Sequence, residues 1–161
     1  MPLGVLGDVL SVEGKHRKAA EHFRAAVDIF KKEESFDQRI NAIELQGFLA
    51  GSIIRSGKAQ EGIELAQTTF HQYDEGDGRV LREKDYYVWA VWKSGCATKM
   101  WNAILDKKVK LDPPTKGMLL EMLDEADRTT VFPDGQTTWG DRSFEMRKDE
   151  IGKIRQRLGI S

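Results

Sequence analysis

The residue types that most often carry metal or acid–base chemistry are few in this sequence, and they are widely spaced. The three histidines, His16, His22 and His71, do not stand at the spacing of a metal-binding pair, and no HExxH motif occurs. Cys96 is the only cysteine, so neither an intrachain disulfide nor a cysteine zinc site can form. No glycine-rich phosphate loop follows a strand, and there is no GxSxG motif. We therefore expect neither a metal nor a cofactor.

Catalysis by this chain would depend on side chains that lie far apart in the sequence. Folding would have to bring Glu44, Arg55 and His71 together, because no nucleophile stands beside a base within one motif. The paired acids at 33–34 and 124–125 are typical of solvated helix ends. We expect that the protein is not an enzyme.

The elements that would position any site are helices. Apolar residues recur every three to four positions through most of the chain, as at Ala19, Phe23 and Phe30. No alternating pattern is long enough for a strand, so the sequence predicts an all-α fold. The stretch 36–55 is apolar on two sides, which indicates an inner helix. The predicted helices are about 15–32, 36–55, 58–73, 84–107, 113–128 and 139–158, with a shorter one near 3–13.

The breaks between these helices carry turn and capping residues. Gly14 and Gly57 each follow an apolar helix and precede a basic residue, as expected where a tight turn needs a positive φ. Asp112 before Pro113 indicates an N-cap followed by proline in the first helical turn. The stretches 74–78 and 129–138 are predicted loops.

Composition and charge describe one globular domain without a strong field. The 161 residues are 40% hydrophobic and 32% charged, with a net charge of −1, so nothing favours nucleic acid or anionic lipid overall. The longest uncharged stretch, 45–54, is too short to span a membrane, and the N-terminal residues lack the pattern of a signal peptide. We expect a cytoplasmic protein that has no membrane partner.

An internal repeat relates successive helix pairs. The first unit reads Leu3-x2-Leu6-Gly7-x2-Leu10, Gly14 and Ala19-x3-Phe23-x2-Ala26; the second reads Leu49-Ala50-x2-Ile53, Gly57 and Gly62-x3-Ala66; the third keeps only Leu119-x3-Leu123-x2-Ala126. Small residues at a helix crossing let two backbones approach, and large residues one turn away fill the flanking space. The pattern resembles the tetratricopeptide-repeat family. The 43 residues from Gly14 to Gly57 exceed the usual repeat of about 34, which points to a long-repeat variant.

The resemblance implies a right-handed α-α superhelix that forms a single domain over 1–161. It would contain about three helical hairpins, near 3–32, 36–73 and 84–128. The helix near 139–158 carries Phe144, Ile151, Ile154 and Leu158 on one stripe and would cap the last hairpin, covering Leu119, Leu120 and Leu123.

The same resemblance implies a non-enzymatic scaffold that binds a peptide or a helix of a partner protein. Its groove would be lined by the first helix of each hairpin, and the candidate binding residues are Glu44, Phe48, Arg55, Tyr87, Trp92 and Lys93. Trp92 projects about 240° away from Tyr86 around its helix, because six residues separate them. It is therefore either an anchor for the partner or a core residue under the second hairpin.

A second hypothesis is a regulatory or nucleic-acid-associated domain that uses its last helix. That helix holds six basic residues, but four acidic residues interrupt them, which is typical of an ordinary charged surface. Nucleic acid is therefore the less favoured partner, and another protein or peptide is the favoured one.

Overall fold

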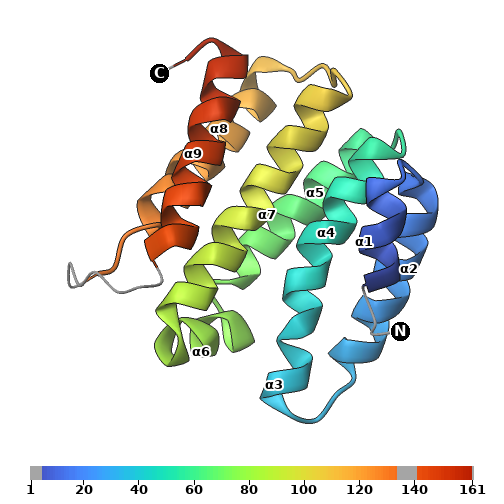
Figure 1. The fold of residues 1–161 in the computed structure, drawn as a ribbon, viewed down its shortest axis with the longest axis vertical. Helices are drawn as coiled ribbons and strands as arrows, with labels where there is room; N and C mark the ends of the chain where they lie inside the picture. Colours follow the sequence, from blue (N-terminus) through green and yellow to red (C-terminus); the bar gives the residue numbers. More distant parts are fainter. Residues whose placement is uncertain (1–4, 134–140, 161) are drawn as a thin grey trace.

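A computed structural model describes residues 5–133 and 141–160, and in this part of the chain every regular element is a helix (Figure 1). The predicted all-α fold is confirmed. The helices are α1 Val5–Val12, α2 His16–Lys31, α3 Phe36–Arg39, α4 Asn41–Arg55, α5 Ala59–Gln72, α6 Gly76–Lys84, α7 Tyr86–Asp106, α8 Pro113–Thr129 and α9 Asp141–Leu158. Leu3 and the expected start of the last helix at 139–140 lie outside the described residues.

The long helices form two layers. Helices α1, α4, α7 and α9 lie side by side in the front layer of Figure 1, and α2, α5 and α8 lie behind them. Helix α4 packs against α2, α5 and α7, and α7 packs in turn against α8 and α9. The successive pairs α1–α2, α4–α5 and α7–α8 are antiparallel hairpins, and α9 follows as a single helix. The right-handed superhelical twist stays a prediction.

The hairpin turns have the expected backbone. Gly14 and Gly57 take positive φ angles of 78° and 103°, as predicted for tight turns between helices. The third turn reaches the same region without glycine, at Lys108 with a φ of 52°. Asp112 caps α8 by accepting a hydrogen bond from the Thr115 amide at 2.8 Å, which confirms the predicted N-cap.

Two predicted boundaries are wrong. The stretch 74–78 was expected to be a loop, but α6 begins inside it at Gly76. Any side chain at Gly78 would overlap the backbone of Gln72 and Tyr73, so the glycine lets α6 pack onto the end of α5. The predicted helix 36–55 is divided at Ile40. There the side-chain amide of Asn41 donates hydrogen bonds to the backbone carbonyls of Asp37 and Gln38, and these bonds compete with the backbone hydrogen bonds of a continuous helix.

Small residues lie where the helices cross. A Cβ added at Gly62 would stand 2.5 Å from Ile54 Cγ1 and 2.7 Å from the Ala50 carbonyl oxygen, so α5 can approach α4 only with glycine there. Gly7 has the same relation to the ring of Phe23 in the first hairpin, at 2.7 Å. These contacts occupy the positions that carry the sequence repeat, so close packing is its physical cause.

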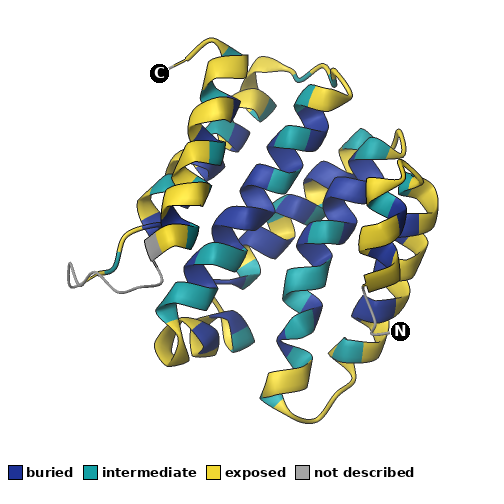
Figure 2. Cartoon of the chain, in the orientation of Figure 1, coloured by how far each residue is buried: buried dark blue, intermediate teal, exposed yellow. Residues whose placement is uncertain are grey.

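Burial is concentrated in the middle of the front layer. Figure 2 shows α4 and α7 mostly buried or intermediate, whereas the outer sides of α2 and α9 are exposed. Phe144, Ile151 and Ile154 of α9 are buried against α7 and α8, and Leu119 and Leu123 of α8 are fully covered. Helix α9 therefore covers the last hairpin through its predicted stripe. None of the described helices is long and apolar enough to cross a membrane.

Two glycine substitutions should change stability in opposite directions. Gly62→Ala should lower the free energy of unfolding by about 1–3 kcal/mol, because the new methyl group meets backbone atoms that cannot move aside. Gly152→Ala in α9 is the control, since nothing lies within 4 Å of an added Cβ there. The control should gain about 0.5–1 kcal/mol from helix propensity. Urea denaturation measures both, and a stabilised Gly62→Ala would contradict the crossing geometry.

Candidate functional site

The front layer contains a hollow of about 260 Å³ between α1, α4 and α7, here called the front groove. It exists because each helix turns one stripe of residues, spaced three or four apart, toward the same side. Its lining residues are Asp8, Ser11, Val12, Phe48, Gly51, Ser52, Arg55, Lys99 and Asn102. Gly51 and Ser52 are small residues, so the α4 side of the groove protrudes little. The hydroxyl oxygens of Ser11 and Ser52 lie 3.5 Å apart across the groove.

Lys99 lines the groove from α7. Its ammonium lies 4.3 Å from the centre of the Phe48 ring, a cation–π contact between α7 and α4. Burial lowers the pKa of Lys99, and the nearby Arg147 guanidinium lowers it further. Burial also raises the pKa of Glu44 and of Asp8, whereas the charge of Lys99 acts against both shifts. Lys99 therefore lies near the carboxylates of Glu44 and Asp8.

An ion-pair cluster closes one end of the groove. Arg55 donates to Asp106 at 2.7 Å, and Arg157 of α9 approaches the other oxygen of the same carboxylate at 3.0 Å. His16 lies nearby, and burial lowers its pKa together with the positive charges of Arg55 and Lys107. The cluster joins the C-terminal ends of α4, α7 and α9.

The structure brings some of the predicted binding residues together. Phe48 and Arg55 line the front groove, and Glu44 lies one turn before Phe48 on the same face of α4. Trp92 is half-buried, two turns before Lys99 on the same face of α7, and packs against the main core. It is thus partly core and partly exposed, and its role as an anchor stays a prediction.

Tyr87 and Lys93 do not line the groove. Tyr87 is half-buried and packs against Phe144 of α9 and Phe132, with ring centres 5.1 and 6.3 Å away. Lys93 is only 1% exposed, so its prediction as a binding residue is wrong. Its ammonium pairs with Asp74 at 2.8 Å and with Glu125 at 2.9 Å, and both of these carboxylate side chains are partly exposed.

The three side chains considered for catalysis do not converge. Glu44 and Arg55 are eleven residues apart on α4, which corresponds to about 16 Å along the axis. His71 is exposed at a different hollow, beside Gln67 and Met122. Burial raises the pKa of Cys96 to about 12, and its thiol contacts the Ala66 carbonyl oxygen at 3.4 Å. This thiol is therefore unsuited to act as a nucleophile.

Sequence reasoning missed several groove residues. Asp8, Lys99 and Asn102 come from α1 and α7, whose register relative to α4 is set only by packing. Lys99 stands seven residues after Trp92, so the helical period that placed Trp92 could also have placed Lys99.

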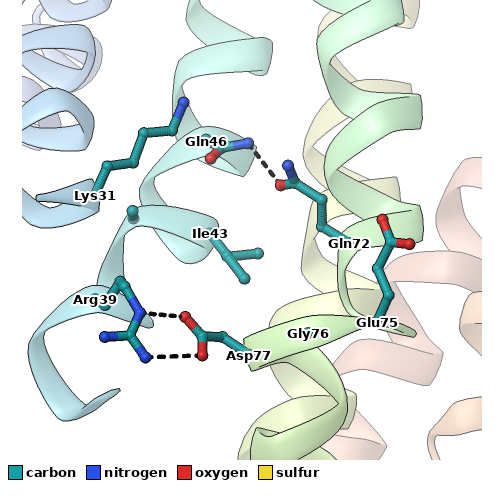
Figure 3. A pocket seen from close by; sticks show the side chains of 9 residues that line it. Lys31, Arg39, Ile43, Gln46, Gln72, Glu75, Gly76 and Asp77 are labelled. Carbon is teal, nitrogen blue, oxygen red and sulfur yellow. Dashed lines mark hydrogen bonds and ion pairs between the residues drawn. The ribbon is translucent and has the colours of Figure 1, made fainter. Parts of the chain in front are cut away.

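A second hollow, of about 440 Å³, lies between α2, α4 and α5 at the end of the molecule that holds α3 and α6. Figure 3 shows Gln46 and Gln72 joined by a hydrogen bond of 2.9 Å above Ile43, and Arg39 paired with Asp77 across the opening. The Arg39 guanidinium donates to both oxygens of Asp77, at 2.6 and 3.0 Å. The fork thus connects α3 to α6 at the opening of this hollow.

The Arg39–Asp77 fork should make stability depend on pH. Hydrogen bonds from Arg39 hold the pKa of Asp77 below its usual value, so its contribution is present at neutral pH and lost on acidification. Asp77→Asn should therefore be less stable than the wild type at pH 7, and the gap should narrow as the pH falls through about 4 and close only below the lowered pKa of Asp77. Thermal melts across this range measure it. A gap that is constant with pH would contradict the assignment.

The basic residues of α9 are largely engaged within the chain. In the described part of the chain, five of its six Lys and Arg side chains form ion pairs, with partners on α7, α8 or α9 itself. Arg155, for example, bridges Asp124 and Asp127 of α8 at 2.8 and 3.0 Å. These contacts leave little free positive charge for a phosphate backbone.

Among the described residues, no group of three or more His, Cys, Asp and Glu side chains is arranged to hold a metal ion. Comparison of the chain with protein-family models, curated proteins and solved structures finds no match.

The two tryptophans at the start of α7 should differ in their effect on folding. Trp89 is 2% exposed and donates its indole N–H to the Tyr73 carbonyl at 2.7 Å, so Trp89→Ala should cost about 3–5 kcal/mol. Trp92→Ala should cost less than about half of that, because part of the ring is already exposed. Urea denaturation compares the two, and equal losses would place Trp92 fully in the core.

Proposed function

We propose that this protein is a non-enzymatic interaction module whose front groove binds a segment of another polypeptide. The observation that carries the proposal is an apolar stripe beside the groove. Val5, Val9 and Val12 of α1 are 40%, 43% and 90% exposed, and Val12 itself lines the groove. Positions 5, 9 and 12 share one helix face, so they present a continuous strip to solvent. Exposed apolar strips of this kind mark surfaces that a partner covers.

The groove offers both parts of a polypeptide-binding surface. Phe48 and the valine stripe supply apolar contact, and Ser11, Asn102 and Lys99 supply polar groups that could fix a segment's register. Three helices from successive hairpins contribute, as expected of a tetratricopeptide-like array, and the resemblance to that family remains part of the proposal.

The alternative of a nucleic-acid contact through α9 has weaker support. The ion pairs of Arg147, Lys148 and Arg155 would have to break before these side chains could reach phosphates. A location in the cytoplasm accords with a free, buried Cys96 in a chain that can form no internal disulfide.

Selection from a random peptide library tests the proposal. The immobilised wild-type chain should enrich a family of related sequences, and a synthetic member should bind in solution. The double change Val9→Asp and Val12→Asp places two charges in the stripe, replaces no buried core residue, and should weaken binding about tenfold or more.

Met118→Asp is the matched control, because Met118 is 51% exposed on α8, away from the front groove. It should leave binding unchanged. Wild-type binding by the double aspartate variant would show that the front groove is not the binding surface.

A further inference from the structure

Two positive side chains converge over one glycine in the middle of the front layer. A Cβ built at Gly95 of α7 would stand 2.7 Å from Arg147 Nη2 and 3.0 Å from Lys99 Nζ. Both nitrogens lie near this one point, so they are at most about 6 Å apart, close enough for strong mutual repulsion. Any side chain at position 95 would displace them, so the glycine is what allows the two cations to meet.

Arg147 is only partly satisfied by its own neighbours. One terminal nitrogen donates to Thr98 Oγ1 at 3.0 Å and to Glu150 at 2.7 Å, and the other donates to the Val91 carbonyl oxygen at 3.0 Å. Its Nε is buried and has no acceptor among the described residues. A buried N–H without a partner is costly, so Arg147 is held beside Lys99 with part of its hydrogen-bonding capacity unused.

Lys99 also lacks an acceptor. In the described part of the chain its ammonium makes no hydrogen bond or ion pair, and its closest recorded partner is the Phe48 ring at 4.3 Å. The Glu150 carboxylate already forms an ion pair with Arg147 and accepts a hydrogen bond from the side-chain amide of Asn102 at 3.0 Å. Glu44 acts on Lys99 only from beyond ion-pair distance. Lys99 therefore lies beside a second cation, Arg147, without a direct acceptor among the described residues.

We propose that the partner segment binds through an acidic side chain whose carboxylate enters the front groove and accepts a hydrogen bond from Lys99 Nζ. The inference rests on the proposed function and names the chemistry of the partner at that surface. A carboxylate would give the Lys99 ammonium the direct acceptor that Glu44 and Asp8 do not supply within ion-pair distance, and a hydrogen bond between two charged groups is stronger than one between neutral groups.

Two features of the surroundings indicate which residues flank the acid in the partner and where the acid lies in its chain. Phe48 and the exposed part of Trp92 flank the cations, so the residues beside the acid in the partner are apolar. Gly95 is the tenth of the 21 residues of α7, so a segment that follows the face continues past it in both directions. The carboxylate therefore belongs to an internal Asp or Glu rather than to a chain end.

The test uses a library of random peptides acetylated at the N-terminus and amidated at the C-terminus, selected on the wild-type chain. The selected peptides should share one acidic position with apolar neighbours. A synthetic member with that Glu replaced by Gln should bind about tenfold or more weaker. This comparison leaves the protein unaltered, so it stays decisive even if a protein variant fails to fold.

Variants of the protein then identify which of its side chains contacts the acidic residue of the peptide. Lys99→Met should weaken the Glu peptide about tenfold or more and leave the Gln peptide nearly unchanged, as a double-mutant cycle requires for a direct contact. Glu44→Gln should tighten the Glu peptide, because a competing negative charge is removed. Lys116→Met, an exposed lysine on α8, is the control and should change nothing.

The outcomes separate this inference from the proposed function. Peptides that are enriched without an acidic preference, and that bind Lys99→Met as well as wild type, would overturn the inference and leave the groove as a binding surface. Binding only to peptides with a free C-terminus would contradict the claim that the carboxylate belongs to an internal Asp or Glu. No enrichment of any peptide would overturn the proposed function and the inference with it.

Discussion

Helix α7 buries the ammonium of Lys93, and the arrangement of the surrounding helices follows from how that charge is satisfied. Asp74 after α5 and Glu125 of α8 each lie within 3 Å of the nitrogen, and the rings of Phe70 and Trp89 cover it at 4.6 and 5.1 Å. An unpaired ammonium in the interior would cost several kcal/mol, so the second hairpin and α8 must both reach this point. The pairing thereby fixes the rotation of α7 about its axis. Gly95 and Lys99 are about 200° and 240° further round the helix, so a buried Lys93 turns them to the front.

This rotation could not be derived from the sequence, although the helix itself could. The apolar period and the glycine turns gave the long helices and hairpins, because those features depend on residues close in sequence. Lys93 looked like a surface residue because lysine is rarely buried, and its two acidic partners are 19 and 32 residues away. Trp89 went unnoticed for the same reason: its burial depends on the Tyr73 carbonyl, which no local pattern reveals.

The residues of the candidate site likewise fall into those that one helix face predicts and those that only tertiary packing brings together. Phe48 and Arg55 were predicted because one helix face carries both, and the structure keeps them in the front groove. Lys99 and Arg147 are 48 residues apart, and only the docking of α9 on α7 brings them together. The additional helix α6 was missed because glycines at 76 and 78 indicate a loop locally, whereas Gly78 serves a contact with α5. Tertiary packing overrides local turn signals at that point.

Glycine therefore has two different roles in the same two-layer architecture. At Gly62 an added side chain would meet backbone atoms of α4, so the residue serves packing alone. At Gly95 it would meet the tips of Lys99 and Arg147, which are charged groups and not a helix backbone. Helix α9 is accordingly more than a cover for the last hairpin. Its apolar stripe, through Ile151 and Ile154, positions the arginine that faces the front layer. The hydrophobic contact that stabilises the end of the array thus also brings the second cation over Gly95.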